Sequence, residues 1–444
     1  MTFQSSRRRF LKSSAMLSAA SILRPHVSAS ERTMEDETKS PNERPRIGCI
    51  GQGGMGSGDA SQAARYGDIV AVCDVDRSHA EAAKKDPRRG KGKAEIYEDY
   101  RKLLDRKDID IVTISTPDHW HVRIAIAALK AGKDIYCQKP LTLTIDEGKQ
   151  LSHVLHAPNR VFPVGPPQRS ADGNMFLKAV AMVQGGRIGK VRRAICAIGG
   201  GETTDKPFAK SKPPAGLNWD MWLGQAPNVE YIKQRCHGSF RWWYEYSGGK
   251  LTDWGAHHVD IAQWALGYDQ SGPETVELVS AKLPVPFKNG YPTVDDKYNT
   301  AQSFMIRNTF ANGAELLIRD DTENGIVFDG DKGTFFVSRG GWRGAAVDEL
   351  KSNPIDEKVL VALRKGKRLS GHMANFMECC RDRSMPASDV YSHHRALTTC
   401  HLANIAIRLG RKLKWDPATE QIVGDSEANG WQKREQRKGY EVEA

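Results

Sequence analysis

Short apolar segments alternate with helix-forming segments from Arg46 to about residue 165, and this alternation constrains the fold more than any other feature. The apolar segments are rich in β-branched residues and read RIGCIG, DIVAVCDV, IDIVTIST, KDIYCQKP and RVFPVG. The segments between them, such as MGSGDASQAARYG and HVRIAIAALKAG, have the composition of helices. Strands that alternate with helices form right-handed βαβ units around a buried parallel sheet. The sequence therefore predicts an α/β fold that begins with a doubly wound Rossmann sheet over residues 46–165.

The order of elements changes after residue 165. A helix-like segment, DGNMFLKAVAMVQGG, precedes a strand-like one, VRRAICAIGG, and a loop region rich in Pro and Trp spans residues 201–250. Strand-like segments then follow one another with short turns: TVELVSAKL, AQSFMIRNTF, AELLIRD, GIVFDG and GTFFVSR. Successive strands without intervening helices form antiparallel or mixed sheets. We expect an α+β domain over residues 166–415 with an open, mostly antiparallel sheet, and a C-terminal tail over residues 416–444 that is charged and irregular after Trp431.

The N-terminus has the pattern of an export signal. SRRRFLK is followed by the mildly apolar SSAMLSAASIL and by the small-residue motif VSA, which predicts cleavage after Ala29. This order of regions is typical of secretory signals, and the paired arginines resemble the twin-arginine signal. We expect a signal peptide over residues 1–29, a linker over 30–45, recognition by the twin-arginine export machinery and a periplasmic or otherwise exported location. No later segment is long and apolar enough for a membrane span.

Charge and cysteine content exclude two classes of partner. The net charge is +11, but five basic residues and no acid lie in the first 29 residues, and no basic run elsewhere is interleaved with aromatics. We therefore expect no nucleic-acid partner. The eight cysteines include no CxxC pair, and several lie within strand-like segments. Structural thiols are the favoured interpretation, without a zinc site.

A glycine-rich turn follows the first predicted strand. In GQGGMG, Gly51, Gly53 and Gly56 have the spacing G-x-G-x-x-G, and the loop also contains Gly54 and Met55. The first glycine allows a tight turn, the second lets the backbone approach a pyrophosphate, and the third allows close packing of helix and strand. Because the motif follows a strand and begins a helix, it predicts a dinucleotide site.

The acid that follows the second strand indicates which dinucleotide binds. Asp74 ends DIVAVCD about 20 residues past the glycines, where a carboxylate accepts hydrogen bonds from the adenosine ribose. A carboxylate repels a 2′-phosphate, which favours NAD. Arg77 lies close enough to leave NADP open, since an arginine can pair with that phosphate.

The segment GGKLTDWGAHHVD brings two aspartates and two histidines close together. At about 100° per helical residue, Asp253, His257 and Asp260 share one face and His258 points away. His257 has the pKa range of a general base, and Asp253 can orient its imidazole. Two alternatives stay open: a metal bound by the three residues of the shared face, and Asp253 as a helix N-cap. We expect no obligatory metal, because hydride transfer to a nicotinamide needs none.

Together with GQGGMG, the segments STPDHWH, KDIYCQKPL and GGKLTDWGAHHVD resemble the glucose–fructose oxidoreductase and inositol 2-dehydrogenase family, often called Gfo/Idh/MocA. The resemblance covers about residues 46 to 410. It implies that Lys139 hydrogen-bonds the substrate beside the nicotinamide and that Asp253 and His257 complete the catalytic set. It also implies a substrate-binding second domain and a homo-oligomer formed through the open face of its sheet.

The same resemblance assigns further cofactor contacts. Pro117 and His121 match a loop that lines the cofactor, and Gln138 stands where the family usually has Glu. A glutamine can still accept a bond from a ribose hydroxyl, but it lacks the carboxylate charge next to Lys139. The predicted cofactor-binding residues are Gly51, Gly53, Gly54, Met55, Gly56, Asp74, Pro117, His121, Gln138 and Lys139.

Other side chains are candidates for contact with the substrate. Gln168 and Arg169 follow the last Rossmann strand, and the region before GGKLTD is dense in aromatics. Aromatic faces stack on the C–H faces of sugars. We therefore add Trp243, Tyr244 and His258 to Gln168 and Arg169 as candidate substrate contacts.

These features predict an NAD(P)-dependent oxidoreductase that acts on a sugar, polyol or related carbohydrate. Lys139 can stabilise the developing alkoxide while His257 takes the hydroxyl proton. One alternative is an NAD-dependent glycosidase or lyase that oxidises its sugar transiently before elimination. Another is a non-catalytic sugar-binding protein. Export of a folded nucleotide-binding protein further predicts that the cofactor is held tightly.

Overall fold

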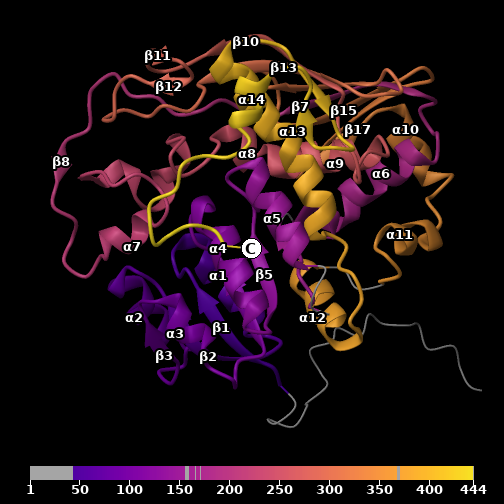
Figure 1. Ribbon diagram of the computed structural model, residues 1–444. Coiled ribbons are helices and arrows are strands. Elements are labelled where there is room, and N and C mark those ends of the chain that lie inside the picture. The colour runs from indigo at the N-terminus through magenta and orange to yellow at the C-terminus, as the bar shows by residue number, and fades with distance from the viewer. Residues whose placement is uncertain (1–43, 156–159, 166, 171, 368–370, 444) are drawn as a thin grey trace, which may run out of the picture. The chain divides into compact units, whose positions relative to one another are not determined.

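Figure 1 shows the computed structural model, in which the described residues are 44–155, 160–165, 167–170, 172–367 and 371–443. They belong to one unit, Glu43–Ala444. The predicted signal peptide, and the predicted linker up to residue 43, lie outside the described residues. No helix in the described ranges is long and apolar enough to cross a membrane.

The first sheet confirms the Rossmann prediction. Its six strands have the order β3-β2-β1-β4-β5-β6, and every neighbouring pair is parallel. This is the order of a doubly wound dinucleotide-binding sheet, in which the chain reverses direction across the sheet beside β1. The strands are β1 (Arg46–Ile50), β2 (Asp68–Cys73), β3 (Glu95–Tyr97), β4 (Ile111–Ile114), β5 (Asp134–Gln138) and β6 (Val164–Gly165).

Helices connect these strands, and polar caps begin two of them. Asp76 caps the second helix by accepting from the backbone N–H of Ser78, and Asp99 caps the third through Arg101. The strands β4 and β5 are buried along their whole length, as expected for the centre of a parallel sheet. The helices are α1 (Gly54–Ala63), α2 (Arg77–Lys85), α3 (Tyr100–Leu104), α4 (His121–Lys130) and α5 (Ile145–Leu155).

The second sheet has nine strands in the order β17-β16-β15-β7-β14-β13-β10-β18-β19. Among the described residues only β14 and β7 pair in parallel, so the sheet is mixed and mostly antiparallel, as predicted. Its strands are β7 (Val191–Ala197), β10 (Thr275–Lys282), β13 (Ser303–Thr309), β14 (Glu315–Arg319), β15 (Gly325–Gly330), β16 (Thr334–Ser338), β17 (Gly341–Arg343), β18 (Leu413–Asp416) and β19 (Gln421–Ile422).

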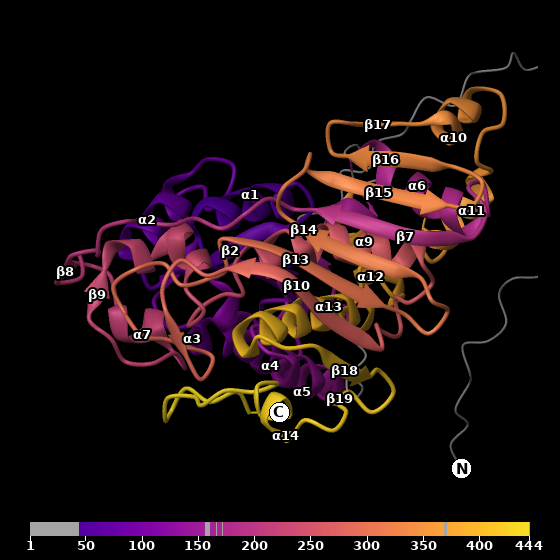
Figure 2. The same cartoon turned by 90° about the horizontal axis from the view of Figure 1, so that it is seen from above.

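Three helices pack on one face of this sheet: α6 (Met175–Gln184), α9 (Gly255–Ala265) and α13 (Val390–Leu409). Figure 2 looks onto the sheet from the other side, where the strands lie in front of these helices. Buried and half-buried residues alternate along β13 and β14, because one face meets the helices and the other does not. The helix α9 contains His257, His258 and Asp260 of the predicted acid–base segment, so its packing on the sheet holds these residues in place.

Short elements occupy the loop region and the other connections. In the loop region they are β8 (Lys210–Ser211), α7 (Trp219–Leu223), β9 (Tyr231–Ile232), η5 (Lys233–Arg235), η6 (His237–Trp242) and α8 (Lys250–Asp253). Elsewhere they are η2 (Asp118–Trp120), η3 (Pro167–Arg169), η4 (Asp172–Asn174), β11 (Phe287–Lys288), β12 (Tyr291–Pro292), α10 (Ala345–Asp348), η7 (Glu349–Lys351), α11 (Glu357–Leu363), α12 (His372–Asp382) and α14 (Ser426–Gly430).

The segment predicted as a C-terminal tail begins with regular elements. It contains β19 and α14, and its part after Trp431, predicted to be irregular, has neither helix nor strand among the described residues. That part packs against the unit, because Arg437 donates to the carbonyl of Gly224 (2.8 Å) and Val442 is buried. Isolated apolar residues in the charged sequence supply contacts that its composition does not reveal. The cysteines agree with the prediction of structural thiols: all eight are free and only Cys380 is partly exposed.

Candidate active site

The glycine-rich turn lies where β1 ends and α1 begins. Gly51 has a φ of +81°, and a Cβ there would come within 2.7 Å of the Ser115 backbone on the next strand. A Cβ on Gly56 would lie 1.9 Å from the carbonyl oxygen of Gly51. Only glycine fits either position. The glycine spacing predicts a tight turn and close packing of helix and strand, and the structure has both because neither position has room for a side chain.

A cavity of about 570 Å³ extends from this turn along the carboxyl ends of the strands. Eight of the ten predicted cofactor residues line it: Gly51, Gly53, Gly54, Met55, Asp74, Pro117, Gln138 and Lys139. The other two support its wall. Gly56 lets α1 approach the turn, and the imidazole of His121 lies between the carbonyls of Pro140 (2.7 Å) and Thr116 (2.9 Å). Burial lowers the pKa of His121 to about 4, so the ring is neutral.

Asp74 is oriented by the backbone around it. Its two carboxylate oxygens accept hydrogen bonds from the N–H groups of Gln52 (2.6 Å) and Asp76 (2.9 Å). The carboxylate thus faces the cavity beside the glycine turn, where an adenosine ribose fits. Arg77 pairs with Glu81 on the exposed side of α2, so its guanidinium has a partner other than a 2′-phosphate.

A segment of the second domain bonds to the backbone that follows Asp74. Leu217 forms a β-bridge with Asp76, the N–H of Arg77 donates to the Gly216 carbonyl (2.9 Å), and the N–H of Asn218 donates to the Val75 carbonyl (2.9 Å). We call residues 216–218 the covering segment. It joins the two domains at the place where the adenosine part of a dinucleotide would lie.

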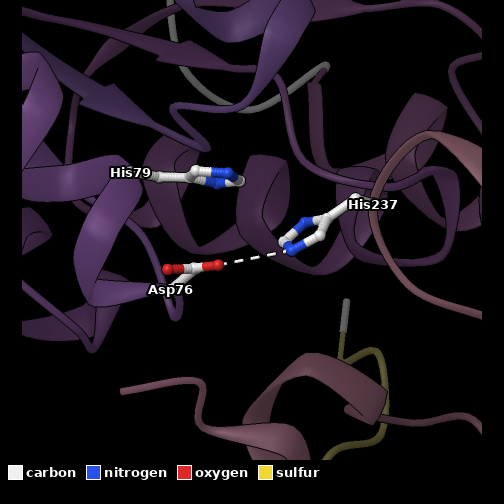
Figure 3. Close-up of side chains that lie close together, drawn as sticks. All are labelled: Asp76, His79 and His237. Atoms are coloured by element: carbon white, nitrogen blue, oxygen red, sulfur yellow. Dashed lines mark ion pairs between the residues drawn. The ribbon is translucent and has the colours of Figure 1, made fainter. Parts of the chain in front are cut away.

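Two histidines and an aspartate meet at the same end (Figure 3). His237 Nε2 lies 3.3 Å from Asp76 Oδ2, and His79 Nδ1 lies 3.4 Å from Asp74 Oδ2. The bond to Asp74 raises the pKa of His79, whereas burial lowers that of His237. One donor atom each from Asp76, His79 and His237 lie within 4.8 Å of one another, the only such group of three found among the described residues. The alternative metal site at Asp253, His257 and Asp260 is therefore not supported.

Lys139 and Asp253 meet at the opposite end of the cavity. The Lys139 ammonium donates to Asp253 Oδ1 and to the Asp253 backbone carbonyl (3.2 Å). Arg241, which also lines the cavity, donates to the same carboxylate oxygen (3.2 Å). Burial alone would raise the pKa of Asp253, but the charges of Lys139 and Arg241 outweigh it and lower that pKa. Asp253 is therefore an ionised carboxylate that bonds to two cationic side chains.

His257 differs from its prediction in two respects. The helix is interrupted at Trp254, between α8 and α9, and Asp253 bonds Lys139 and Arg241 instead of orienting the imidazole. His257 Nδ1 is buried without a hydrogen-bond partner among the described residues. Burial and the positive charges of Lys139 and Arg339 lower the pKa of His257 well below 6.5, so the ring is neutral at physiological pH. Its expected pKa near working pH is therefore wrong.

Asp260 and Arg169 form a fully buried ion pair behind this site. Two guanidinium nitrogens of Arg169 donate to the two oxygens of Asp260, each at 2.7 Å. Burial would raise the pKa of Asp260, but the Arg169 charge and His393 lower it to about 2. The guanidinium of Arg169 is thus used inside the protein, which corrects its assignment as a substrate contact.

Of the remaining candidate substrate contacts, Gln168 bonds to the backbone of the acid–base segment. It is buried, and its amide fits with the nitrogen donating to the His257 carbonyl (2.9 Å) and the oxygen accepting from Arg339 Nε (3.3 Å). His258 is buried and pairs with Asn324 Oδ1 (3.1 Å). These contacts are structural ones within the protein.

The two predicted aromatic contacts lie away from the nucleotide cavity. Trp243 is completely buried and donates its indole N–H to the Gln234 carbonyl (2.8 Å), so it is a core residue. Tyr244 lines a different cavity. Neither lines the cavity that contains Lys139.

Gln138 has a partner that the sequence pattern did not suggest. Its amide nitrogen donates to both carboxylate oxygens of Asp59 (3.0 and 3.1 Å), a buried residue of α1. Ser115 also donates to Asp59 (2.7 Å). Burial nevertheless raises the pKa of Asp59 to about 6. An acid on the buried face of the first Rossmann helix is the signal that could have identified this residue.

Two family models match most of the chain. Residues 45–165 match the NAD-binding Rossmann fold of the Gfo/Idh/MocA oxidoreductase family, and residues 202–442 match its C-terminal alpha/beta domain. The chain belongs to the Gfo/Idh/MocA family.

Curated relatives of this family member include proteins of two kinds. A glycosyl hydrolase family 109 protein of Shewanella pealeana is 34% identical over 166 residues, which are 33% of this chain and 36% of the relative. An inositol 2-dehydrogenase of Klebsiella pneumoniae is 29% identical over 169 residues, 36% of this chain and 49% of the relative. The chain therefore matches less than half the length of either relative.

Solved structures of similar fold cover more of the Gfo/Idh/MocA chain. The WlbA dehydrogenase of Bordetella pertussis, in complex with NADH and UDP-GlcNAcA, has a TM-score of 0.57 at 18% identity, over 84% of this chain and 99% of that one. The aldose-aldose oxidoreductase of Caulobacter crescentus, complexed with glycerol, has a TM-score of 0.58 at 16% identity, with the same coverage. At these identities the likeness shows the fold alone.

Within this family, the Asp59 contact accounts for the departure at position 138. A glutamate at that position would place a second carboxylate against Asp59 in a buried site, where like charges are strongly unfavourable. A glutamine converts the contact into two hydrogen bonds. Arg241 is the second residue that sequence reasoning missed, and its only signal was a basic residue within FRWW.

Proposed function

We propose that the protein is an NAD-dependent oxidoreductase that oxidises or reduces a secondary hydroxyl of a sugar, polyol or related carbohydrate. The observation that carries this proposal is the cluster of Lys139, Asp253 and Arg241 at one end of a cavity whose other end contains the glycine turn. A dinucleotide bound along that cavity would place its reactive ring towards the cluster. Bound NAD would supply the acceptor for the electrons of the substrate C–H bond.

NAD is favoured over NADP because of the acid beside the turn. The Asp74 carboxylate faces the ribose position with two fixed backbone donors behind it, and a 2′-phosphate there would meet a like charge. The arginine that could have offset this repulsion, Arg77, is paired with Glu81.

Lys139, Asp253 and His257 can then have separate roles in proton transfer. Lys139 lines the cavity and carries N–H donors that can bind the substrate oxygen and stabilise negative charge as it develops. Ionised Asp253 holds the Lys139 side chain in place, and Arg241 keeps that carboxylate ionised. The family resemblance assigns proton transfer to His257, whose ring is neutral but does not line the cavity, and whose buried Nδ1 has no partner among the described residues.

We further propose that the protein is exported by the twin-arginine route and retains its cofactor. The pattern of residues 1–29 supports export of a folded protein. The covering segment supports retention, because its backbone bonds to Val75 and Arg77 hold the second domain against the segment that follows Asp74.

A redox-neutral glycosidase is the second candidate. It is favoured by the similarity of 33–35% of the chain to glycosyl hydrolase family 109 proteins. In such a reaction transient oxidation would acidify the neighbouring C–H bond, elimination would break a glycosidic bond, and reduction would restore the sugar. Lys139, Asp253 and His257 would carry out the proton transfers of this reaction as well.

The test is to incubate the protein with free sugars, polyols and aryl glycosides and to follow both product and reduced nicotinamide. An oxidoreductase oxidises a free sugar or polyol when a second carbonyl compound is supplied, and the Lys139→Met variant loses this activity. Release of the aglycone with no second reactant would identify the glycosidase. Saturable sugar binding without turnover of any compound would instead indicate a non-catalytic binding protein.

The oligomeric state remains a separate proposal. The face of the nine-stranded sheet opposite α6, α9 and α13 has half-buried residues along β13 and β14, and we propose that a second copy of the chain packs on it. Light scattering should then give a mass of at least twice that of the mature chain; a monomer would refute this assembly.

A further inference from the structure

A second cavity, of about 630 Å³, lies away from the nucleotide cavity. The start of α5, the end of α13, the β11–β12 hairpin and the segment after α14 contribute to its wall. None of the described residues lines both cavities. Apart from Gly248, at the start of GGKLTDWGAHHVD, and Tyr244, a candidate substrate contact, the family resemblance and the proposed reaction use no residue of this second cavity.

Two arginines of this cavity have no acidic partner. Among the described residues no carboxylate oxygen lies within 4.0 Å of the guanidinium of Arg408 or of Arg434, although most other arginines form such pairs. Arg408 uses its Nε to donate to the Gly290 carbonyl (2.9 Å), and Arg434 uses one Nη to donate to the Tyr244 carbonyl (3.3 Å). The other Nη of Arg434 is buried and has no hydrogen-bond partner in the part of the chain that the structure describes.

An unpaired buried N–H of a charged group is costly, and such groups usually meet an acceptor. Burial lowers the pKa of Arg408 to about 10, with the charge of Arg434 acting in the same direction, and burial also lowers the pKa of Arg434. The positive charges of the two guanidinium groups therefore repel each other. An anion bound between them would offset this repulsion and accept a hydrogen bond from the unpaired N–H.

Aromatic rings surround one of these arginines. The guanidinium carbon of Arg408 lies 4.2 Å from the ring centre of Trp431, 4.7 Å from that of Tyr244 and 5.5 Å from that of Tyr291. The stacking fixes the guanidinium plane, so its terminal N–H groups are oriented in advance for a planar oxyanion. Tyr291 is 60% exposed and leaves a ring face for the C–H face of a ligand.

Acidic residues of the same wall limit the charge of the ligand. Glu245, Asp295 and Glu435 line the cavity, and their oxygens can accept hydrogen bonds from hydroxyl groups. A phosphate dianion would be repelled by these carboxylates, whereas one carboxylate on a polyhydroxylated ring satisfies both kinds of group.

We propose that this cavity binds a sugar acid, with its carboxylate between Arg408 and Arg434 and its ring against Tyr291 and Trp431. The site adjoins the catalytic segment through Ser247. This residue lines the cavity, immediately precedes GGKLTD, and donates to Asp118 (2.6 Å) in the wall of the nucleotide cavity. The proposal does not depend on which reaction the protein catalyses.

The experiment is calorimetric titration of the full protein with D-glucuronate and D-galacturonate, and with D-glucose and D-galactose as uncharged counterparts. We expect at least one acid to bind saturably, and its counterpart to bind at least about tenfold more weakly. Arg408→Gln and Arg434→Gln should each weaken that binding by about tenfold to a hundredfold, the range for a charge-assisted hydrogen bond. The control Arg343→Gln, an exposed arginine paired with Glu323, should leave it unchanged.

Three results would overturn the proposal. The first is that neither acid binds better than its uncharged counterpart. The second is that both arginine variants, shown by circular dichroism to be folded, bind the acid as the wild type does. The third is that Lys139→Met abolishes binding while the arginine variants retain it, which would place the ligand in the catalytic cavity. Two separate variants keep the test decisive if one of them does not fold.

Discussion

The amide nitrogen of Gln138 donates to both carboxylate oxygens of Asp59, across the junction between β5 and α1. This contact connects the residue before Lys139 with the helix that follows the glycine turn. It also gives a physical reason for a neutral residue at position 138, where the family resemblance implies a glutamate. The carboxylate is supplied from α1 and remains buried.

The first prediction concerns Asp59 and pH. Its folded-state pKa is raised to about 6, above the usual value of 3.8, because the carboxylate is buried. The folded state therefore holds its proton more tightly, and the contribution of Asp59 to stability declines as pH rises from about 4 to above 6. Asp59→Asn should increase the free energy of unfolding relative to the wild type at pH 8, by up to about 3 kcal/mol.

Urea unfolding at several pH values checks this expectation. The difference between variant and wild type should shrink as pH falls from about 6 towards 4, and it should disappear below 3.8, where the Asp59 carboxyl is protonated in both states. A difference that does not vary with pH would contradict the raised pKa. Gln138→Glu serves as the converse change: it should destabilise the protein most at high pH, and Asp59→Asn in the same chain should relieve the effect.

A second prediction concerns cofactor choice. Asp74→Ala removes a ribose acceptor and a repulsive charge, so it should weaken NAD binding by about tenfold to a hundredfold and NADP binding less. Titration calorimetry with both dinucleotides measures this change on protein freed of cofactor. Arg77→Ala is the matched control, because its side chain pairs with Glu81 and should not affect the preference. An unchanged ratio of the two affinities in Asp74→Ala would exclude this residue as the ribose ligand.

A third prediction concerns the acid–base residues. Lys139→Met and His257→Ala should each lower kcat by about 10²–10⁴-fold, whereas His258→Ala should cost far less, since its ring pairs with Asn324. Because the pKa of His257 is lowered well below 6.5, its protonation should not reduce kcat/KM between pH 7.5 and 6. A wild-type decline centred near pH 6.5 that disappears in His257→Gln would contradict the buried, neutral state of this ring.

A fourth prediction concerns the buried ion pair. Removing one partner leaves an uncompensated buried charge, so Arg169→Met should lower the free energy of unfolding by about 3–5 kcal/mol. Arg169→Met combined with Asp260→Leu should lower it by less than the single change does. The exposed pair Arg343–Glu323 provides the comparison, and its loss should cost less than about 1 kcal/mol. Equal losses at the two sites, measured by denaturant titration, would be inconsistent with the burial of Arg169.

Local patterns in the sequence predicted much of this molecule. The alternation of strands and helices, the glycine turn and Asp74 depend on residues that are near one another in the chain, and the structure has them as expected. Lys139 and Asp253 are far apart in sequence, and only the family resemblance predicted that they belong to the same catalytic set. Their direct contact was not predicted.

The remaining features depend on packing between distant segments. Arg169 follows the Rossmann sheet, yet its partner Asp260 is on α9, so a helical-wheel argument placed Asp260 with the wrong group. Asp59 and Arg241 acquire their roles only when α1 and η6 reach the cavity. Burial changed the expected pKa of His257, and spacing in a sequence does not reveal burial.

The most direct test of the account is the state of the cofactor in protein exported by its own signal. The exported protein would be dialysed, denatured, and its released small molecules identified by mass spectrometry, while a second sample is assayed with carbohydrates and no added nucleotide. The covering segment predicts roughly one NAD per chain, held at sub-micromolar Kd, or more than about 8 kcal/mol of binding free energy. Carbohydrate should be converted with no net release of NADH. Protein that is empty, needs millimolar NAD and accumulates NADH would contradict retention of the cofactor and leave an ordinary dehydrogenase.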